Sequence, residues 1–282
     1  MPRLIVNADD FGLTAGVNRA IVELHRAGVL TSTTLMARAG ATDAAIALAR
    51  ETPSLGTGCH IVLVDGQPVL PVNRIPTLID RKTGCFHASL TAFLARLFTG
   101  RISASDIERE AAAQIALLKD RGVPLTHIDT HKHTHMFPAV LRPVLRAARA
   151  AGIAAIRNPF EPAWAVRATA GAPWTRRAEV TLLRTLRAAC MRIVADNGFA
   201  TTDGTIAIAG TGILKANTLR SLLRAMPEGT WELVTHPGYN DAGLGQIRTR
   251  LRASREIERE ALIAVREFPQ IPLVNFSGLR RH

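Results

Sequence analysis

The strongest constraint on the fold lies in the first twelve residues. A short apolar run at residues 4–6 leads into the adjacent carboxylates Asp9 and Asp10, and a glycine follows. This pattern predicts a buried strand that delivers an acid pair to an open loop. Adjacent aspartates repel each other, so the pair indicates a neutralising cation or a carboxyl group tuned for proton transfer. The alternative is that one aspartate caps the helix that begins near Thr14 while the other is solvated.

The two aspartates should also differ in direction. Neighbouring side chains of an extended strand point to opposite faces, so Asp9 and Asp10 should not approach one metal ion with the same geometry. One carboxylate would then bind the ion and the other would face the water.

Histidines follow two further strand-like runs. His60 lies in the later half of the run at residues 55–64, and residues 127–135 are rich in histidine. Residues of like parity share one face of a strand, so Asp129 and His131 should point to the same side. One carboxylate and two imidazoles form a facial ligand set that leaves positions open for water and substrate, as a catalytic divalent metal requires.

Other roles for these histidines stay open. His131, His133 and His135 could form a solvated polar loop, and His60 could be a hydrogen-bonded core residue. His236 precedes Pro237 after a late strand and could simply shape a turn. If the metal is present, a spare carboxylate can take the proton of its bound water, and a histidine from another strand can protonate the leaving group. The spare aspartate of the pair and His236 supply these two parts.

The order of elements predicts an α/β fold in a single domain, residues 1–282. We expect strands at residues 4–6, 29–37, 55–64, 125–129, 153–157, 205–209, 231–234 and 271–276, and helices at 15–27, 41–51, 90–98, 104–121, 137–151, 219–225 and 250–266. Such alternation implies a parallel sheet with right-handed crossovers, and seven or eight units favour a closed or nearly closed (β/α) barrel. No glycine-rich phosphate fingerprint follows the first strand, which argues against a dinucleotide-binding sheet. Residues 68–82 should form a loop over the site, and residues 160–200 an inserted helical segment beside it.

A barrel also explains where the polar residues occur. Barrel enzymes place their chemistry at the C-terminal ends of the strands. The residues expected at these ends are Asp9, Asp10, His60, His131, Arg157 and His236.

Composition excludes several classes of protein. No apolar stretch approaches the roughly 20 residues of a membrane helix, and the acid pair leaves no room ahead of it for a secretory signal, so we expect a cytoplasmic protein. Three widely spaced cysteines argue against a disulfide framework or a thiolate zinc site. The net charge of +12 could attract nucleic acid, acidic lipid or phosphorylated substrates. Aromatic residues are scarce and no nucleic-acid motif is present, so we expect no nucleic-acid partner.

Five motifs together resemble one known family. They are LIVNADDFG at residues 4–12, LTSTTLM at 30–36, GCH at 58–60, THIDTHKHTHMFP at 126–138 and THPG at 235–238. In this order, over nearly the whole chain, they resemble the YdjC/ChbG carbohydrate deacetylase family, which includes members associated with hopanoid biosynthesis. The family often has a third histidine where this chain has Lys132.

The resemblance implies a distorted TIM-like (β/α) barrel that uses a divalent metal to remove acetyl groups from N-acetylated amino sugars, in oligosaccharides or linked to glycolipids. Carried over by position, the metal ligands would be Asp10, His60 and His131, the general base Asp9 and the general acid His236. We also expect Arg157 and His133 to bind substrate. Mixed Asp and His ligands suit Zn, Mn, Co or Ni, and Mg with several waters; we expect Mg or Zn.

Two alternatives and one open question remain. The same residues could serve another metal-dependent barrel enzyme, such as a lyase, isomerase or phosphoesterase, or a sugar-binding barrel without catalysis. The basic inserted segment, with Leu182, Leu183, Leu186 and Val194 among its arginines, could contact an anionic or lipid-linked substrate, support a homodimer, or simply pack on the barrel.

Overall fold

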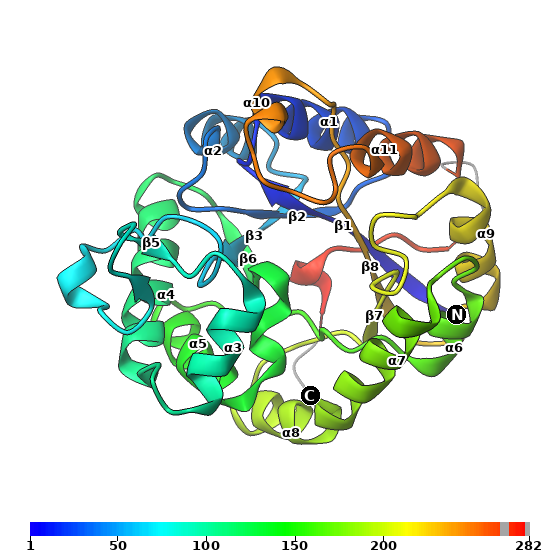
Figure 1. Ribbon diagram of the computed structural model, residues 1–282. Coiled ribbons are helices and arrows are strands. Elements are labelled where there is room, and N and C mark those ends of the chain that lie inside the picture. The colour runs from blue at the N-terminus through cyan, green and yellow to red at the C-terminus, as the bar shows by residue number, and fades with distance from the viewer. Residues whose placement is uncertain (266–270, 280–282) are drawn as a thin grey trace.

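The computed structural model describes residues 1–265 and 271–279 and is built around one curled parallel sheet (Figure 1). Its strands are β1 (Arg3–Phe11), β2 (Ser32–Leu35), β3 (Gly56–Ile61), β6 (Leu125–Thr130), β7 (Gly204–Ile206) and β8 (Thr230–Thr235), in the order β6-β3-β2-β1-β8-β7. Each neighbouring pair is parallel. A separate antiparallel hairpin, β4 (Ile79–Asp80) and β5 (Cys85–Phe86), forms in the expected loop at residues 68–82 and just beyond it.

An irregular segment closes the gap between the two edge strands. The backbone N–H of Arg157 donates to the carbonyl of Ile128 in β6 at 3.1 Å, and that of Thr205 in β7 donates to the carbonyl of Phe160 at 3.4 Å. Pro159 has no N–H to donate, so this segment joins both edges without becoming a regular strand. The expected strand at 153–157 is therefore reduced to isolated bridges, and the expected distorted TIM-like barrel is confirmed.

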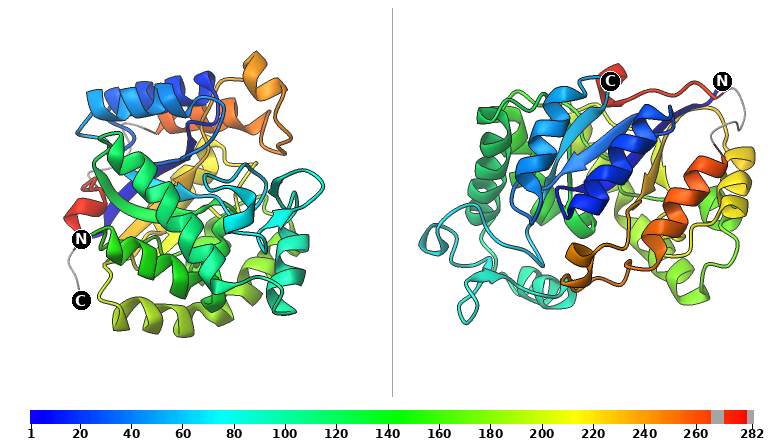
Figure 2. Two further views of the ribbon diagram at one scale, coloured as in Figure 1. Left: turned by 90° about the vertical axis from the view of Figure 1, so that its left-hand side faces the viewer. Right: turned by 90° about the horizontal axis from the view of Figure 1, so that it is seen from above.

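Helices surround the sheet on its outer side (Figures 1 and 2). They are α1 (Ala15–Arg26), α2 (Thr42–Glu51), α3 (Leu90–Phe98), α4 (Ala104–Asp120), α5 (Pro138–Ala150), α6 (Ala163–Ala168), α7 (Trp174–Leu183), α8 (Arg187–Asp196), α9 (Ala216–Ala225), α10 (Ala242–Gly245) and α11 (Ser254–Ala264), with the short 3₁₀ turns η1 (Val72–Arg74), η2 (His131–Met136), η3 (Arg184–Leu186) and η4 (Phe276–Gly278). Thr14, not an aspartate of the acid pair, caps α1 by accepting from the N–H of Val17 at 3.2 Å. In the described part of the chain, no helix has both the length and the apolarity needed to cross a membrane.

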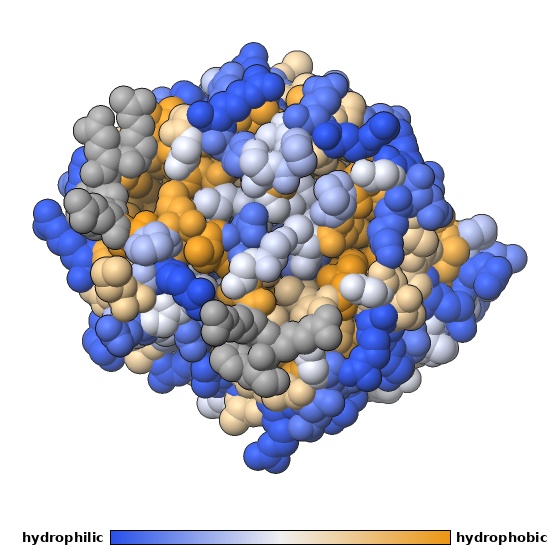
Figure 3. Space-filling model, turned by 180° about the vertical axis from the view of Figure 1, so that it is seen from behind, coloured by the Kyte–Doolittle hydropathy of each residue, from blue (hydrophilic) through white to orange (hydrophobic). Residues whose placement is uncertain are grey.

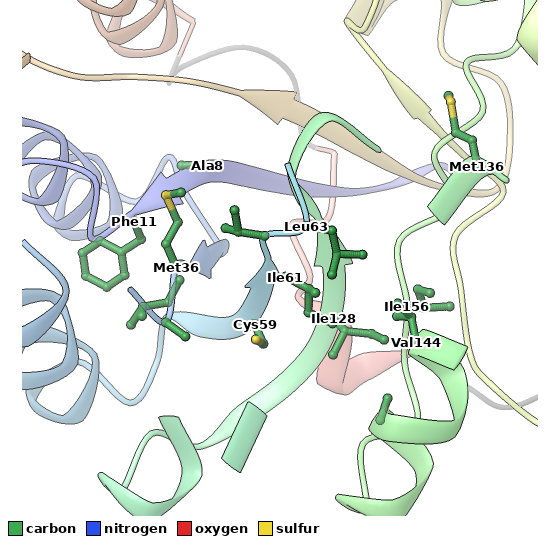
Figure 4. Packing of buried hydrophobic residues seen from close by; sticks show 14 of the residues in the cluster. Ala8, Phe11, Met36, Cys59, Ile61, Leu63, Ile128, Met136, Val144 and Ile156 are labelled. Carbon is green, nitrogen blue, oxygen red and sulfur yellow. The ribbon is translucent and has the colours of Figure 1, made fainter. Parts of the chain in front are cut away.

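Strand parity separates the outer core from the barrel interior. Ala8, Cys59, Ile61 and Ile128 belong to the main apolar core (Figure 4). In the same view this core includes Phe11, Met36, Leu63, Met136, Val144 and Ile156. Residues of the opposite parity, including Asp9, His60 and Asp129, contact one another instead, as described below. The alternation that builds the core therefore also directs the polar side chains inward.

Two expectations for the C-terminal part need correction. The expected strand at 271–276 forms only one bridge, Leu273 to Leu4, before η4 begins. Along one edge of β1, β2 pairs only from Asn7 onward. Only the residues of β1 before Asn7 therefore remain free on that edge to pair with residues 271–276. The expected end of the last helix, at Arg266, lies outside the described residues.

The inserted segment at 160–200 forms α6, α7, η3 and α8. Val194 is buried and Leu183 and Leu186 pack against the main core, while Leu182 is 70% exposed, so only part of the expected apolar stripe packs on the barrel. Seen from behind, hydrophilic side chains ring the outline of the molecule and apolar surface lies on two sides of its centre (Figure 3).

Candidate metal centre

The end of β1 departs from a regular strand at the acid pair. Asp10 has a φ of 67°, in the left-handed region that non-glycine residues rarely adopt. The pairing of β1 with β2 also shifts its register between Ala8 and Phe11. Both carboxyl groups consequently lie near His60. The backbone at Asp10 is therefore not extended as expected, but the two carboxyl groups still belong to different groups of potential ligands, Asp10 with His131 and Asp9 with Asp129.

Three potential ligand atoms face one another at this strand end. Oδ1 of Asp10 lies 3.6 Å from Nε2 of His60 and 3.6 Å from Nδ1 of His131, and the two imidazole nitrogens are 3.2 Å apart. Ligand atoms about 2.0–2.1 Å from a tetrahedral zinc ion lie about 3.3–3.5 Å from one another. The spacing in this protein therefore fits one metal ion with little movement.

The hydrogen bonding of Asp10 also fits a metal. Its Oδ1 is buried and has no hydrogen-bond partner among the described residues, whereas buried carboxylate oxygens are normally satisfied. An ion between Asp10, His60 and His131 would satisfy that oxygen and use both imidazoles as ligands. The residues present thus fit the divalent metal expected from the sequence.

Asp129 holds His60 from the other side. Nδ1 of His60 donates to Oδ1 of Asp129 at 2.7 Å, which leaves Nε2 as the ligand atom. A carboxylate behind a ligating histidine is the usual way to fix its tautomer and orientation. Burial by itself lowers the pKa of His60, but Asp129, Asp9 and Asp10 raise it to about 9. The surroundings of this imidazole therefore favour a positive charge.

A second group of potential ligands, Asp9, His60 and Asp129, is already occupied by a side chain. Arg157 donates to both oxygens of Asp9, at 2.6 and 2.9 Å, and pairs with Asp129 and with Glu232. Burial favours a raised pKa for Asp9, but Arg157 and His60 hold the pKa well below its usual range. The guanidinium thus fills the place that a second ion would need.

Arg157 was expected from the sequence to bind substrate. Its side chain has no exposed surface and is enclosed by Asp9, Asp129 and Glu232. A residue so placed orients Asp9. The substrate contact expected of Arg157 stays a prediction, and in this structure its side chain contacts Asp9, Asp129 and Glu232 instead.

His236, directly after β8, lies beside Asp9. Its Nε2 is 3.8 Å from Oδ2 of Asp9, and its side chain is 12% exposed. Its backbone N–H donates to Oε2 of Glu258 at 2.7 Å. The structure therefore brings His236 to the acid pair, with one face open to solvent.

The other histidines of η2 differ in their surroundings. Lys132 and His133 both have left-handed φ values, 55° and 51°. Lys132 pairs with Asp65 at 2.6 Å, across the loops that follow β3 and β6. Burial lowers the pKa of His133 to about 3, and its Nδ1 is buried without a partner among the described residues. Nδ1 of His135 is hydrogen-bonded to the hydroxyl of Thr130 at 2.7 Å, which makes His135 part of the framework.

Helix α4 fixes one wall of the site through three buried polar residues, which are spaced four apart. Asp106 accepts from the N–H of Thr77, Glu110 accepts from the N–H groups of Val69 and Leu70, and Gln114 bonds to both backbone groups of Val62. The loop that follows β3 is thus held by hydrogen bonds along its length. The amphipathic pattern of residues 104–121 predicted the helix but not this function.

Two further charged residues at the site were not predicted. Arg255 and Glu258 of α11 are both buried, and they contact Asp10 and His236 respectively. In the sequence they lie among similar charged residues of an ordinary surface-like helix, and only their burial distinguishes them.

The chain is also similar to known proteins over nearly its whole length. The family model described as YdjC-like protein matches residues 3–268. A carbohydrate deacetylase of Thermoanaerobacter pseudethanolicus is 29% identical, over 93% of this chain and 91% of the relative. A chitooligosaccharide deacetylase of Serratia marcescens is 32% identical, over 93% and 90%. A crystal structure from Enterococcus faecalis V583, proposed to be a cellobiose-phosphate cleavage protein, superposes with a TM-score of 0.75 at 26% identity and covers 98% of this chain and 97% of that one.

Proposed function

The chain belongs to the YdjC-like family, and on that premise we propose that it is a metal-dependent hydrolase that removes the acetyl group from an N-acetylated amino sugar. The observation that carries the proposal is the buried, unpartnered Oδ1 of Asp10, which faces His60 and His131. The substrate class is supported by relatives named carbohydrate deacetylase and chitooligosaccharide deacetylase.

The reaction breaks an amide bond by hydrolysis. A divalent ion held by Asp10, His60 and His131 would lower the pKa of a bound water toward about 7 and polarise the acetyl carbonyl. Asp9 stays ionised at neutral pH because Arg157 outweighs its burial, so it can accept a proton from the attacking water. His236, 3.8 Å from Asp9, gives a proton to the departing amine nitrogen. The C–N bond breaks, acetate leaves and the amine stays on the sugar.

A phosphoesterase is the second candidate, because the solved structure from Enterococcus faecalis is described in terms of a sugar phosphate. The charges at the centre argue against it. Among the described residues, the guanidinium groups beside the acid pair are those of Arg157 and Arg255, and both pair with carboxylates. A phosphate dianion would therefore have to compete with these carboxylates for the two guanidinium groups.

The test is an assay of both products on one protein preparation. Chelated protein is reloaded separately with Mg, Mn, Co, Ni or Zn and given N-acetylglucosamine, its oligomers and a disaccharide phosphate. We expect acetate release with at least one metal, no phosphate release, and loss of activity in His131→Ala. His25→Ala is the matched control, because the ring of His25 is hydrogen-bonded to the carbonyl of Leu30 and the hydroxyl of Ser54, ahead of β2 and β3. Phosphate release without acetate, or oligosaccharide binding without either product, would refute the proposal.

A further inference from the structure

Arg255 is a buried arginine with most of its donors unused. Only 1% of the residue is exposed, and its Nη2 donates to Oδ2 of Asp10 at 2.5 Å. Its Nε and Nη1 have no hydrogen-bond partner among the described residues. Arg157, in contrast, uses Nε, Nη1 and Nη2 to pair with carboxylates.

A purely structural role explains Arg255 poorly. Burying a guanidinium is costly and is offset only when its donors are well satisfied. The one donor of Arg255 that is satisfied goes to the carboxylate whose other oxygen faces His60 and His131. The hydrogen bond to Asp10, together with the nearby carboxyl group of Glu258, therefore accounts for the buried charge of Arg255.

The contact also decides which oxygen of Asp10 is available. Because Arg255 holds Oδ2, rotation of the carboxyl group is restricted and Oδ1 remains directed at the two imidazoles. Without Arg255, only the left-handed backbone of Asp10, with a φ of 67°, would direct Oδ1 toward the imidazoles. Hydrogen bonds to ligating carboxylates orient them in this way in metal sites.

The same face of α11 also holds the loop that carries His236. Glu258, one turn after Arg255, accepts from the backbone N–H of His236 at 2.7 Å, and the carbonyl of Arg255 accepts from the N–H of Gly238 at 3.2 Å. One helical turn therefore contacts both the expected ligand from β1 and the expected acid that follows β8.

We propose that α11 is the element that orients the metal centre, and that Arg255 is the positioning residue that sets Asp10 for coordination through Oδ1. The inference rests on the proposed function for the existence of the metal. Neither the family membership nor the ligand set by itself implies that α11 orients the metal centre.

The test measures metal binding without catalysis. Chelated full-length wild type, Arg255→Met, Arg255→Lys and Arg259→Met are titrated calorimetrically with Mn²⁺, and the visible spectrum of the Co²⁺ form reports ligand geometry. Arg259→Met is the matched control, because Arg259 lies on the same helix but stacks on Tyr239, 4.6 Å from the ring centre. We expect Arg255→Met to weaken binding by about 10–100-fold and to alter the Co²⁺ spectrum.

The expected order of affinity is wild type and Arg259→Met first, then Arg255→Lys, then Arg255→Met, because a lysine keeps the charge but not the geometry. Affinity and spectrum of Arg255→Met equal to those of wild type would overturn the role of Arg255. If Arg255→Met does not fold, Arg255→Lys serves as the test variant. Metal affinity of Arg255→Lys within threefold of wild type, with an unchanged Co²⁺ spectrum, would then overturn the role of Arg255. Wild type that binds no divalent ion would instead refute the proposed function.

Discussion

Asp9 and Asp10 are neighbours of the same chemical type, yet their partners differ completely. Both oxygens of Asp9 accept hydrogen bonds from Arg157, and its Oδ1 also accepts from Asn7 at 2.8 Å. Asp10 has one oxygen on Arg255 and the other directed at two imidazoles. This difference in partners, and not a difference in intrinsic acidity, supports the proposed division of labour, in which Asp10 binds the metal and Asp9 accepts the proton.

This division of labour predicts opposite effects for two matched substitutions. Asp9→Asn keeps the shape of the side chain, and Arg157 retains Asp129 and Glu232 as partners. We expect normal metal content and a kcat lower by about 10²–10⁴. Asp10→Asn should lose metal first. Elemental analysis and steady-state kinetics check both, and an active Asp9→Asn enzyme would place the base elsewhere, with His236 the next candidate.

Glu161 gives a pH-dependence that is separate from catalysis. It is buried and accepts from the N–H groups of Ala207 and Ala209, at 2.8 and 2.7 Å. Burial raises the pKa of this carboxyl from 4.5 to about 7. Because the folded pKa lies above the unfolded value, the stability this group contributes is fully present below pH 4.5 and is lost as the pH rises through about 7.

Glu161→Gln should remove that pH-dependence, because the amide does not titrate. Between pH 4.5 and pH 8, the free energy of unfolding of wild type should fall relative to that of Glu161→Gln by about 3 kcal/mol. Urea denaturation of both proteins across this range measures it. A difference between the two proteins that does not change with pH would contradict the raised pKa.

At the scale of elements, α4 shows how a helix can hold a loop as well as a core. Glu110 has no exposed surface, and its two oxygens accept from the N–H groups of Val69 and Leu70 at 2.8 and 3.1 Å. The loop is therefore anchored at its backbone, where sequence changes in its own side chains have little effect. The hydrogen bonds make this segment a fixed wall of the site.

Glu110→Ala should release that wall. Two backbone N–H groups would lose their partner, at a cost of about 1–3 kcal/mol for each group that stays buried. We expect lower stability and faster amide hydrogen exchange at residues 62–77. The control is Glu108→Ala, on the same helix, whose ion pair with Arg146 is partly exposed and should be worth less than about 1 kcal/mol. Unchanged exchange at Val69 and Leu70 would show that other contacts hold the loop.

Most elements could be predicted from the sequence because their signals are local. The helix at 90–98 was predicted with its observed bounds, and that at 15–27 to within one residue, since Thr14 and Gly28 mark its ends. Some strands were predicted too long, as at 29–37 against Ser32–Leu35, and others too short, as at 4–6 against Arg3–Phe11, because the extent of a strand depends on its partners. The bridges at Ala155 and Leu273 depend on partners far away in the chain.

The candidate site shows the same division between local and distant information. His60, His131 and His236 lie where strand-end reasoning placed them, beside the acid pair. The left-handed backbone of Asp10 and the burial of Arg255 have no signature in the sequence. Arg255 and Asp10 are 245 residues apart in the chain, so the contact between them forms only in the folded protein.

At the scale of the whole molecule, a chain with net charge +12 encloses an excess of negative charge. The buried carboxyl groups around the centre are Asp9, Asp10, Asp129, Glu232 and Glu258, and the buried basic groups are Arg157, Arg255 and His60, whose pKa is raised to about 9. A divalent cation would bring this interior closer to neutrality. The metal should therefore stabilise the fold as well as serve the reaction.

Thermal unfolding tests this stabilisation. A metal at 100 times its Kd adds about 2.7 kcal/mol if it binds only the folded protein, which corresponds to a rise in Tm of about 5–10 °C for a chain of this size. His131→Ala should show a far smaller rise at the same metal concentration. Equal rises in the two proteins would mean that the ion binds at another place.

The most direct test of the central claim is acetate release measured against metal stoichiometry. Chelated protein, given an N-acetylated amino-sugar oligomer, should release no acetate. As the preferred metal from the initial screen is added, the rate should rise linearly and level off at one equivalent per chain, while His60→Ala should stay inactive throughout. Full activity in the chelated protein would contradict the assignment of Asp10, His60 and His131 as one catalytic metal centre. So would a metal-dependent rise in rate in His60→Ala equal to that in wild type.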